Sequence, residues 1–389
     1  MASHTRTPIR IARAGMVAAA SPVATLIGID ILRAGGNALD AAVAMSAALA
    51  VLEPESSPLG GGVIALMWDA EGQKLSTLRA VETGAAEIWL TALETWGTRS
   101  PLEALTPAIA LAEDGFALSA AQCERLKSQD MLSDELPNTL RPGAILCQPL
   151  LARTLKQIAQ GGRKALSEDE AAARRTQITK AARTTYRGVD LAESPGSAPE
   201  SSLGSRLRTL ERVDLAALSP ESAEAIHRIA GASKQHLGRS SVAQTAATHC
   251  VVDARGNAVA WTSSSGPSEE SLAAGPWMLF HGTTLWAVGG DADTQTNLQI
   301  VTQLIDSKRS PQEAIESPKW HTAPDGAELF IEDRLPLDTC YELRQRGYAL
   351  TVGGPWSGTS TAQVIQLDPD TGSLFGGSDP RVEGLALGY

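Results

Sequence analysis

Cysteine, long apolar segments and clustered histidines are all scarce in this 389-residue sequence. Its four cysteines lie far apart and include no Cys-x-x-Cys pair, so we expect neither a disulfide framework nor a zinc site. The six histidines form no His-Glu-x-x-His or similar metal-binding pattern. No apolar run is long enough to cross a bilayer, so no membrane span is expected. The cysteines are Cys123, Cys147, Cys250 and Cys340.

Basic residues are also in short supply. The chain has 33 lysines and arginines against 44 aspartates and glutamates, which gives a net charge of -11. A nucleic-acid-binding surface needs a basic footprint, so we expect no nucleic-acid partner. Residues 1–15 include several basic residues but lack the apolar segment of a signal peptide, and the expected location is therefore the cytoplasm.

Several familiar catalytic motifs are missing. The sequence has no Gly-x-x-x-x-Gly-Lys-Ser/Thr or Gly-x-Gly-x-x-Gly run, so nucleotide binding has no support. It also lacks Gly-x-Ser-x-Gly, which argues against the nucleophile of an α/β-hydrolase. We therefore expect chemistry from the chain's own groups, with no cofactor and no metal.

Helix and strand signals both run along the chain. It opens with two helices, the first ending at Gly35-Gly36 and the second, rich in alanine, expected over 38–52. Residues 103–190 read as mainly helical, including the charged stretch 167–188. After residue 240 strands become frequent. Further expected elements are strands near 63–68, 75–81, 246–253, 257–264, 284–288, 348–352, 361–367 and 373–376, and helices near 219–232, 292–307 and 338–346.

The stretch SVAQTAATHCVVDARGNAVAWTSSSG, residues 241–266, reads as two strands around a turn. Its first half contains Thr245 and Thr248. A threonine that becomes a new N-terminus can supply both nucleophile and base, because the freed amine has a pKa of about 8 and can accept the hydroxyl proton. Thr245 heads the expected strand, where such a nucleophile must stand. Threonine is also common in ordinary strands, so a structural role remains open on these residues alone.

A second pattern, LWAVGGDADTQTNLQIV at 285–301, reads as a strand, a glycine pair and a helix. The backbone N–H groups of Gly289 and Gly290, at the expected start of the helix, could form an oxyanion hole. The same pattern also fits an anion site or a plain tight turn.

Long segments of the chain resemble, in order, the γ-glutamyltransferase family. The resemblance implies an α+β fold, the four-layer αββα sandwich of the Ntn hydrolases. It also implies self-cleavage before Thr245 into pieces 1–244 and 245–389, which stay together as a heterodimer, and attack by that threonine on the acyl carbon of a small-molecule substrate. Gly289 and Gly290 would then hold the oxyanion, and Ser264 would hydrogen-bond the nucleophile. The matching segments are 14–62, 105–119, 148–162, VVDARGNAVAWTSSS, AVGGDADTQTNLQIVTQLID, SPQEAIESPKWH and LFGGSDPRVEGLALGY.

The expected nucleophile departs from the family pattern by one position. The family places it five residues before the Val-Val-Asp run, and counting back from Val251 reaches Ala246. An insertion of one residue after Thr245 restores the match, with Gln244–Thr245 as the cleaved bond. Without that insertion the chain would be an uncleaved, non-catalytic homologue.

The substrate-binding segments depart further. Val81 stands where the family has the arginine that holds the glutamyl α-carboxylate, and Arg79, on the same face of the strand, is a candidate replacement. We take Arg79, Glu82 and Asp291 as the candidate substrate-binding residues. The family's Ser-Ser segment and its substrate-binding Asn and Asp are missing.

These departures, and a Gly-Gly-Asp ending that resembles the acylase-like branch, favour a non-glutamyl substrate. An amide or carbon–carbon bond in a natural-product pathway is one such possibility. A true γ-glutamyl hydrolase or transferase is the alternative.

Overall fold

The computed structural model describes most of the chain. Thr245, Glu82, Val81 and Gly266 lie outside the described residues, so the predictions made for them are not addressed by the fold. The described residues are 5–80, 84–128, 140–166, 176–195, 202–234, 246–265, 274–323 and 326–389.

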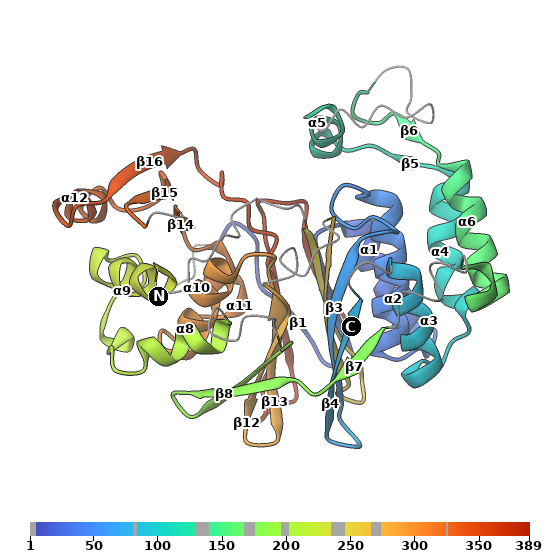
Figure 1. The fold of residues 1–389 in the computed structure, drawn as a ribbon, viewed down its shortest axis with the longest axis horizontal. Coiled ribbons are helices and arrows are strands. Elements are labelled where there is room, and N and C mark those ends of the chain that lie inside the picture. The colour runs from blue at the N-terminus through green and yellow to red at the C-terminus, as the bar shows by residue number, and fades with distance from the viewer. Residues whose placement is uncertain are drawn as a thin grey trace.

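Two sheets face each other at the centre of the molecule, and helices cover the outer face of each (Figure 1). Within the described residues each sheet has seven strands, and all neighbouring strands in the two sheets are antiparallel. This is the four-layer αββα sandwich, so the predicted fold class is confirmed.

Sheet 1 has the order β19-β2-β10-β11-β3-β4-β7. Its strands are β2 (Met16–Ala19), β3 (Gly62–Asp69), β4 (Lys74–Ala80), β7 (Gln177–Thr179), β10 (Ala246–Val252), β11 (Ala258–Ser264) and β19 (Leu385–Gly388). Its outer face is covered by α1 (Pro22–Arg33), α2 (Ala38–Leu52) and α3 (Ala85–Trp96), and α4 (Pro101–Asp114) and α6 (Pro149–Gly161) lie further out, beyond α2 (Figure 1). The short β5 (Phe116–Ala117), α5 (Ala120–Ser128) and β6 (Ile145–Leu146) project from this side, and η1 (Gly162–Ala165) follows α6.

Sheet 2 has the order β1-β18-β17-β13-β12-β9-β8. Its strands are β1 (Arg10–Ala12), β8 (Ala182–Tyr186), β9 (Val189–Glu193), β12 (Trp277–His281), β13 (Thr284–Gly290), β17 (Gln363–Leu367) and β18 (Leu374–Ser378). On its outer side lie α8 (Leu203–Leu210), η3 (Leu215–Ala217), α9 (Ala223–Lys234), α10 (Thr294–Ile305) and α11 (Pro311–Glu316). A small sheet of β14 (Trp320–Thr322), β15 (Glu328–Glu332) and β16 (Ala349–Gly353) lies further out with α12 (Leu337–Gln345).

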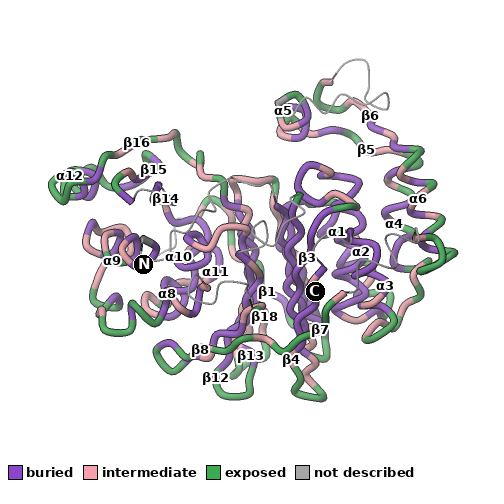
Figure 2. The backbone as a smooth tube through the Cα atoms, viewed as in Figure 1, coloured by how far each residue is buried: buried purple, intermediate pink, exposed green. Residues whose placement is uncertain are grey.

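The alanine-rich helix α2 is the most deeply buried of these elements, and all 15 of its residues are buried. Asn37 and Asp40 form a capping box at its start, so its first backbone N–H groups are satisfied without water. Alanine suits this place because α2 packs against sheet 1 on one side and other helices on the other. Figure 2 shows this buried layer beside the two buried sheets.

The stretch 177–193 corrects the prediction. Residues up to 190 were expected to continue a helical region, but the stretch forms β7, β8 and β9. β7 and β8 are edge strands of their sheets and are mostly exposed, so they carry polar residues and lack the apolar alternation that marks a strand. Among the described residues, no helix has the length and apolar character needed to cross a membrane.

Residues on both sides of position 245 build both sheets. Sheet 1 takes β2, β3, β4 and β7 from before it and β10, β11 and β19 from after it. Sheet 2 takes β1, β8 and β9 from before it and the remaining strands from after it. The predicted pieces 1–244 and 245–389 are therefore interleaved parts of one sandwich.

Candidate active site

The predicted hairpin is present and its register is regular. β10 and β11 pair without a bulge from Ala246 opposite Ser264 to Val252 opposite Ala258. β11 in turn pairs with β3, which places Gly62 on the other side of Ser264. Ala246, Ser264 and Gly62 therefore lie side by side at one end of sheet 1.

The side chains of β10 alternate between two environments. Ala247 and Val251 join the core beneath the helices, whereas Cys250 and Val252 join the core between the sheets. Because strand side chains alternate with a period of two, Ala246 and Thr248 face sheet 2. The candidate nucleophile Thr245 immediately precedes this strand but lies outside the described residues.

Ser264, the predicted partner of the nucleophile, is fully buried at the end of β11. By the same alternation it shares a face with Thr262, whose Oγ1 lies 3.2 Å from Oγ1 of Thr248. A Cβ on Gly61 would collide with the carbonyl oxygen of Ser264, so glycine is needed there for the preceding loop to close on the strand end. A set of buried hydroxyls therefore lines this end of the space between the sheets.

Gly290 reaches the same place from sheet 2. A Cβ built on Gly290 would lie 3.2 Å from Cγ2 of Thr248 and 3.1 Å from Cα of Pro276. The structure thus brings Thr248 of sheet 1 close to Gly290 of sheet 2, and Ser264 lies at the same end of sheet 1, two residues along β11 from the partner of Thr248. The hydroxyl pair of Thr248 and Thr262 was not predicted as a unit, although the hairpin turn at 253–257 would have placed the two residues opposite each other.

The glycine pair stands in a strand rather than at a helix start. Gly289 pairs with Trp277 of β12 and Val364 of β17, and Gly290 pairs with Gln363. Helix α10 begins only at Thr294, because the side chain of Asp293 caps it by accepting from the N–H of Thr296 at 2.6 Å.

This position constrains the oxyanion hypothesis. The N–H groups of neighbouring strand residues point to opposite sides of the strand, within the plane of the sheet. Gly289 and Gly290 cannot both direct an N–H to one atom while both keep regular strand geometry. One of the two is therefore the natural donor to a given oxygen, and Gly290, at the strand end beside Thr248, is the better placed.

Asp291, predicted to bind substrate, is buried and fully engaged by the chain itself. One carboxylate oxygen accepts from the N–H of Asp293 at 2.8 Å, and the other accepts from Oγ of Ser360 at 3.0 Å and the N–H of Thr361 at 2.7 Å. Burial, with the nearby charge of Asp293, raises the pKa of Asp291 to about 7 despite these donors. Through these hydrogen bonds, Asp291 stabilises the turn that follows Gly290.

Asn297 of α10 holds the other side of the same turn. Its Nδ2 donates to the carbonyl of Asp291 at 2.9 Å, and its Oδ1 accepts from Nε1 of Trp277 at 2.8 Å. Trp277 is fully buried against Gly289. Sequence reasoning missed Asn297, Ser360 and Thr361. Nothing local marks Asn297 as a partner of the turn, and Ser360 and Thr361 lie 69 and 70 residues along the chain from Asp291.

Arg79 lies at a distance from this cluster. The register of sheet 1 puts Thr248, Thr262, Ile64 and Arg79 in one row across four strands. Three strand spacings separate Arg79 from Thr248, which is about 14 Å. One of the Arg79 guanidinium nitrogens donates to the carbonyl of Pro195 at 3.0 Å, just beyond β9 of sheet 2.

His249 lies on the face of β10 opposite to Thr248. His249 faces α2, where its Nε2 donates to the carbonyl of Ala42 at 3.0 Å, and full burial lowers its pKa to about 3. It stacks on Trp261 and does not face Ser264 or Gly290. No group of three or more potential ligands that could hold a metal ion is found in the described part of the chain.

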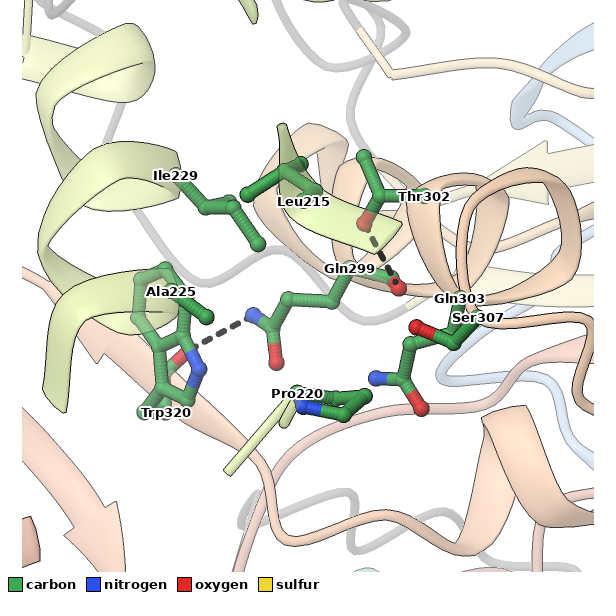
Figure 3. A pocket seen from close by; sticks show the side chains of 9 residues that line it. All are labelled: Leu215, Pro220, Ala225, Ile229, Gln299, Thr302, Gln303, Ser307 and Trp320. Carbon is green, nitrogen blue, oxygen red and sulfur yellow. Dashed lines mark hydrogen bonds between the residues drawn. The ribbon is translucent and has the colours of Figure 1, made fainter. Parts of the chain in front are cut away.

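A pocket lies elsewhere, on the helical side of sheet 2 (Figure 3). Two of its polar side chains are engaged within the protein: Gln299 donates to the carbonyl of Trp320 at 2.8 Å, and Thr302 to the carbonyl of Gln299 at 3.2 Å. None of its lining residues belongs to the cluster between the sheets. The lining residues are Leu215, Pro220, Ala225, Ile229, Gln299, Thr302, Gln303, Ser307 and Trp320.

Comparison with known families agrees with this arrangement. The family model described as gamma-glutamyltranspeptidase matches residues 24–88, 83–174 and 274–389. The chain belongs to the gamma-glutamyltranspeptidase family. The resemblance predicted from the sequence motifs is thereby confirmed.

Two characterised relatives align over nearly the whole chain. The glutathione hydrolase proenzyme of Escherichia coli (strain K12) is 26% identical, over 98% of this chain and 93% of the relative. The acylase ACY 1 proenzyme of Pseudomonas sp. (strain V22) is also 26% identical, over 96% and 93%. The first alignment spans 545 positions, more than the 389 residues of this chain, so the relative contains segments with no counterpart here.

Solved structures show the same fold. The cephalosporin acylase from Bacillus halodurans superposes with a TM-score of 0.86 at 21% identity, covering 100% of this chain and 98% of that one. The gamma-glutamyltranspeptidase of Helicobacter pylori gives a TM-score of 0.51 at 26% identity, covering 60% of this chain and 84% of that one.

Proposed function

We propose that this chain is a self-processing Ntn hydrolase or acyltransferase that uses Thr245 to attack the acyl carbon of a non-glutamyl substrate. The observation that carries the proposal is the close approach of Gly290 to Thr248 across the sheets, at the end of sheet 1 where Ser264 lies opposite Ala246, the first residue of the strand that Thr245 immediately precedes. The names of its relatives, which include hydrolases and acylases described as proenzymes, support this class of chemistry.

The proposed mechanism uses only groups of the chain. Cleavage of the Gln244–Thr245 bond frees the amine of Thr245, which takes the proton from Oγ1 as the oxygen attacks the carbonyl carbon. Ser264 holds the threonine hydroxyl, and a backbone N–H of the glycine pair, foremost Gly290, stabilises the oxyanion. The leaving group departs with the proton held by the amine. Water or an amine then attacks the acyl-enzyme and releases Thr245.

The substrate is proposed to lack the γ-glutamyl group. Val81 replaces the carboxylate-binding arginine of the family pattern, and a valine cannot form bidentate bonds to a carboxylate. Arg79 donates to the carbonyl of Pro195 and lies about 14 Å from Thr248 along the sheet. An amide, or a carbon–carbon bond beside a carbonyl, presents the carbon that the mechanism needs.

A second candidate, a non-catalytic homologue, is favoured by a specific observation. Ala246 stands directly opposite Ser264, and β10 has no bulge that could absorb an inserted residue between Ala246 and Val252. If Ala246 occupies the former nucleophile position, the chain keeps the scaffold without the chemistry.

Turnover assays on matched variants separate these candidates. Wild type, Thr245→Ala and Thr248→Val would be assayed with chromogenic anilides carrying γ-glutamyl, glutaryl and simple aliphatic acyl groups. The proposal predicts turnover of a non-glutamyl anilide by wild type and Thr248→Val, and a loss of at least about a thousandfold in Thr245→Ala. If wild type with an intact Thr245 hydrolyses none of the anilides, the non-catalytic homologue is favoured. If wild type prefers the γ-glutamyl anilide, the proposed substrate class is refuted.

A further inference from the structure

A buried ionic cluster lies next to the turn that follows Gly290. The guanidinium of Arg381, whose side chain is 1% exposed, donates from Nε to one oxygen of Glu332 at 2.6 Å and from Nη2 to the other at 3.1 Å. Nη1 donates to Asp379 at 3.0 Å and to the carbonyl of Ile315 at 3.1 Å, and Nη2 also donates to the carbonyl of Ser317 at 3.0 Å. All five N–H donors of Arg381 are therefore used inside the protein.

Glu332 links this cluster to segment 358–362. One of its carboxylate oxygens accepts from the N–H of Gly358 at 3.1 Å. A Cβ on Gly358 would lie 3.0 Å from that oxygen and 3.3 Å from Nε of Arg381, so the segment packs directly on the ion pair. Burial alone would raise the pKa of Glu332, but Arg381 and Arg334 lower it to about 2. The carboxylate stays ionised and keeps its hydrogen bonds across the physiological range.

Segment 358–362 is also held at its other end. The carbonyl of Ala362 accepts from the N–H of Asp379 at 3.1 Å, which ties it to the same cluster. Between the two anchors, Ser360 and Thr361 supply the donors to the carboxylate of Asp291. The next residue, Gln363, pairs with Gly290 across β17 and β13.

We propose that Glu332 and Arg381 are positioning residues for Gly290, acting through segment 358–362 and Asp291. The ion pair fixes the segment, the segment fixes the carboxylate of Asp291, and Asp291 fixes the turn that ends β13. The inference rests on the proposed function only for the role of Gly290 as oxyanion donor. A backbone donor must be held within about 0.5 Å of its productive position to stabilise a transition state. The buried contacts from Glu332 to Asp291 would restrict the N–H of Gly290 in this way.

Hydrogen exchange measured by mass spectrometry tests the inference on the full chain, whether or not it turns over substrate. Ser360→Ala removes one hydrogen-bond donor to Asp291. Arg381→Lys keeps the positive charge but loses the planar guanidinium that forms two hydrogen bonds to Glu332. We expect amide exchange in a peptide covering 286–293 to rise about tenfold in Ser360→Ala, the order of magnitude for losing one buried hydrogen bond, and further in Arg381→Lys. Ser357→Ala, in the same loop but without a contact to Asp291, is the matched control and should leave this peptide unchanged.

Unchanged exchange at 286–293 in Ser360→Ala, or a rise spread evenly over the whole chain, would overturn the inference. If Arg381→Lys does not fold, Glu332→Gln, which keeps the shape of the side chain and removes its charge, takes its place and should raise exchange in the same peptide. Where wild type is active, Ser360→Ala should lower kcat at least about tenfold with KM changed less than about twofold. An inactive wild type with the predicted exchange pattern would refute the proposed function and leave the positioning role intact.

Discussion

The substitution Gly289→Ala tests the packing that places the glycine pair. An added Cβ at this position would lie 2.6 Å from Cζ2 and 2.7 Å from Cη2 of Trp277, closer than carbon atoms approach in proteins. Trp277 is fully buried, and its Nε1 donates to Asn297 at 2.8 Å, so the ring cannot move away freely. Either the ring shifts and weakens that hydrogen bond, or β13 moves away from β12.

The expected cost follows from these two effects. Overpacking a well-filled core costs about 1–3 kcal/mol, and loss of a buried hydrogen bond adds about 1 kcal/mol. Replacement of glycine by alanine restricts the unfolded chain and returns about 0.5 kcal/mol. We expect Gly289→Ala to lower the free energy of unfolding by about 1.5–3.5 kcal/mol, seen as a lower midpoint of urea unfolding at an unchanged m-value.

A second substitution makes the test specific. Trp277→Phe removes both of the ring atoms that collide with the new methyl group, so Gly289→Ala should cost at least about 1 kcal/mol less in a Trp277→Phe background. Gly290→Ala, whose nearest contacts are 3.1 and 3.2 Å, should cost less than Gly289→Ala. Strictly additive effects of Gly289→Ala and Trp277→Phe, or a larger loss in Gly290→Ala, would refute the reasoning.

Two further predictions follow from the sheets and from Asp291. After cleavage, fragments 1–244 and 245–389 should co-elute in size-exclusion chromatography without denaturant and separate only on unfolding, because both contribute strands to both sheets; separation under native conditions would contradict the interleaved arrangement. The raised pKa of Asp291, about 7 against an ordinary value of 3.8, means that its protonated form stabilises the fold below about pH 4 and that this contribution is lost as the pH rises through 7. From pH 5 to pH 8, the free energy of unfolding of wild type, measured in urea, should therefore fall relative to that of Asp291→Asn by on the order of 2 kcal/mol. A difference between the two proteins that does not change with pH would count against the raised pKa of Asp291.

The hairpin shows what the sequence can predict well. Its turn residues and alternating strands placed both strands within one residue of β10 and β11. From that register, the position of Ser264 opposite Ala246 follows by counting.

The remaining features depend on contacts between distant parts of the chain. Glycine has no strong preference for the end of a strand over the start of a helix, so the glycine pair was placed at the helix start. Asp293, a good helix cap, was the local signal that α10 begins later. The ion pair of Glu332 and Arg381 joins residues 49 positions apart. No sequence pattern around either residue predicts this pairing.

Intact mass spectrometry of freshly purified protein, followed by N-terminal sequencing of any fragment, most directly tests whether a threonine at the head of β10 becomes a chain terminus. The account predicts two polypeptides, residues 1–244 and 245–389, with the smaller one beginning Thr-Ala-Ala-Thr-His. A single polypeptide of 40.7 kDa in protein that turns over substrate would contradict it. So would a fragment beginning at Thr248.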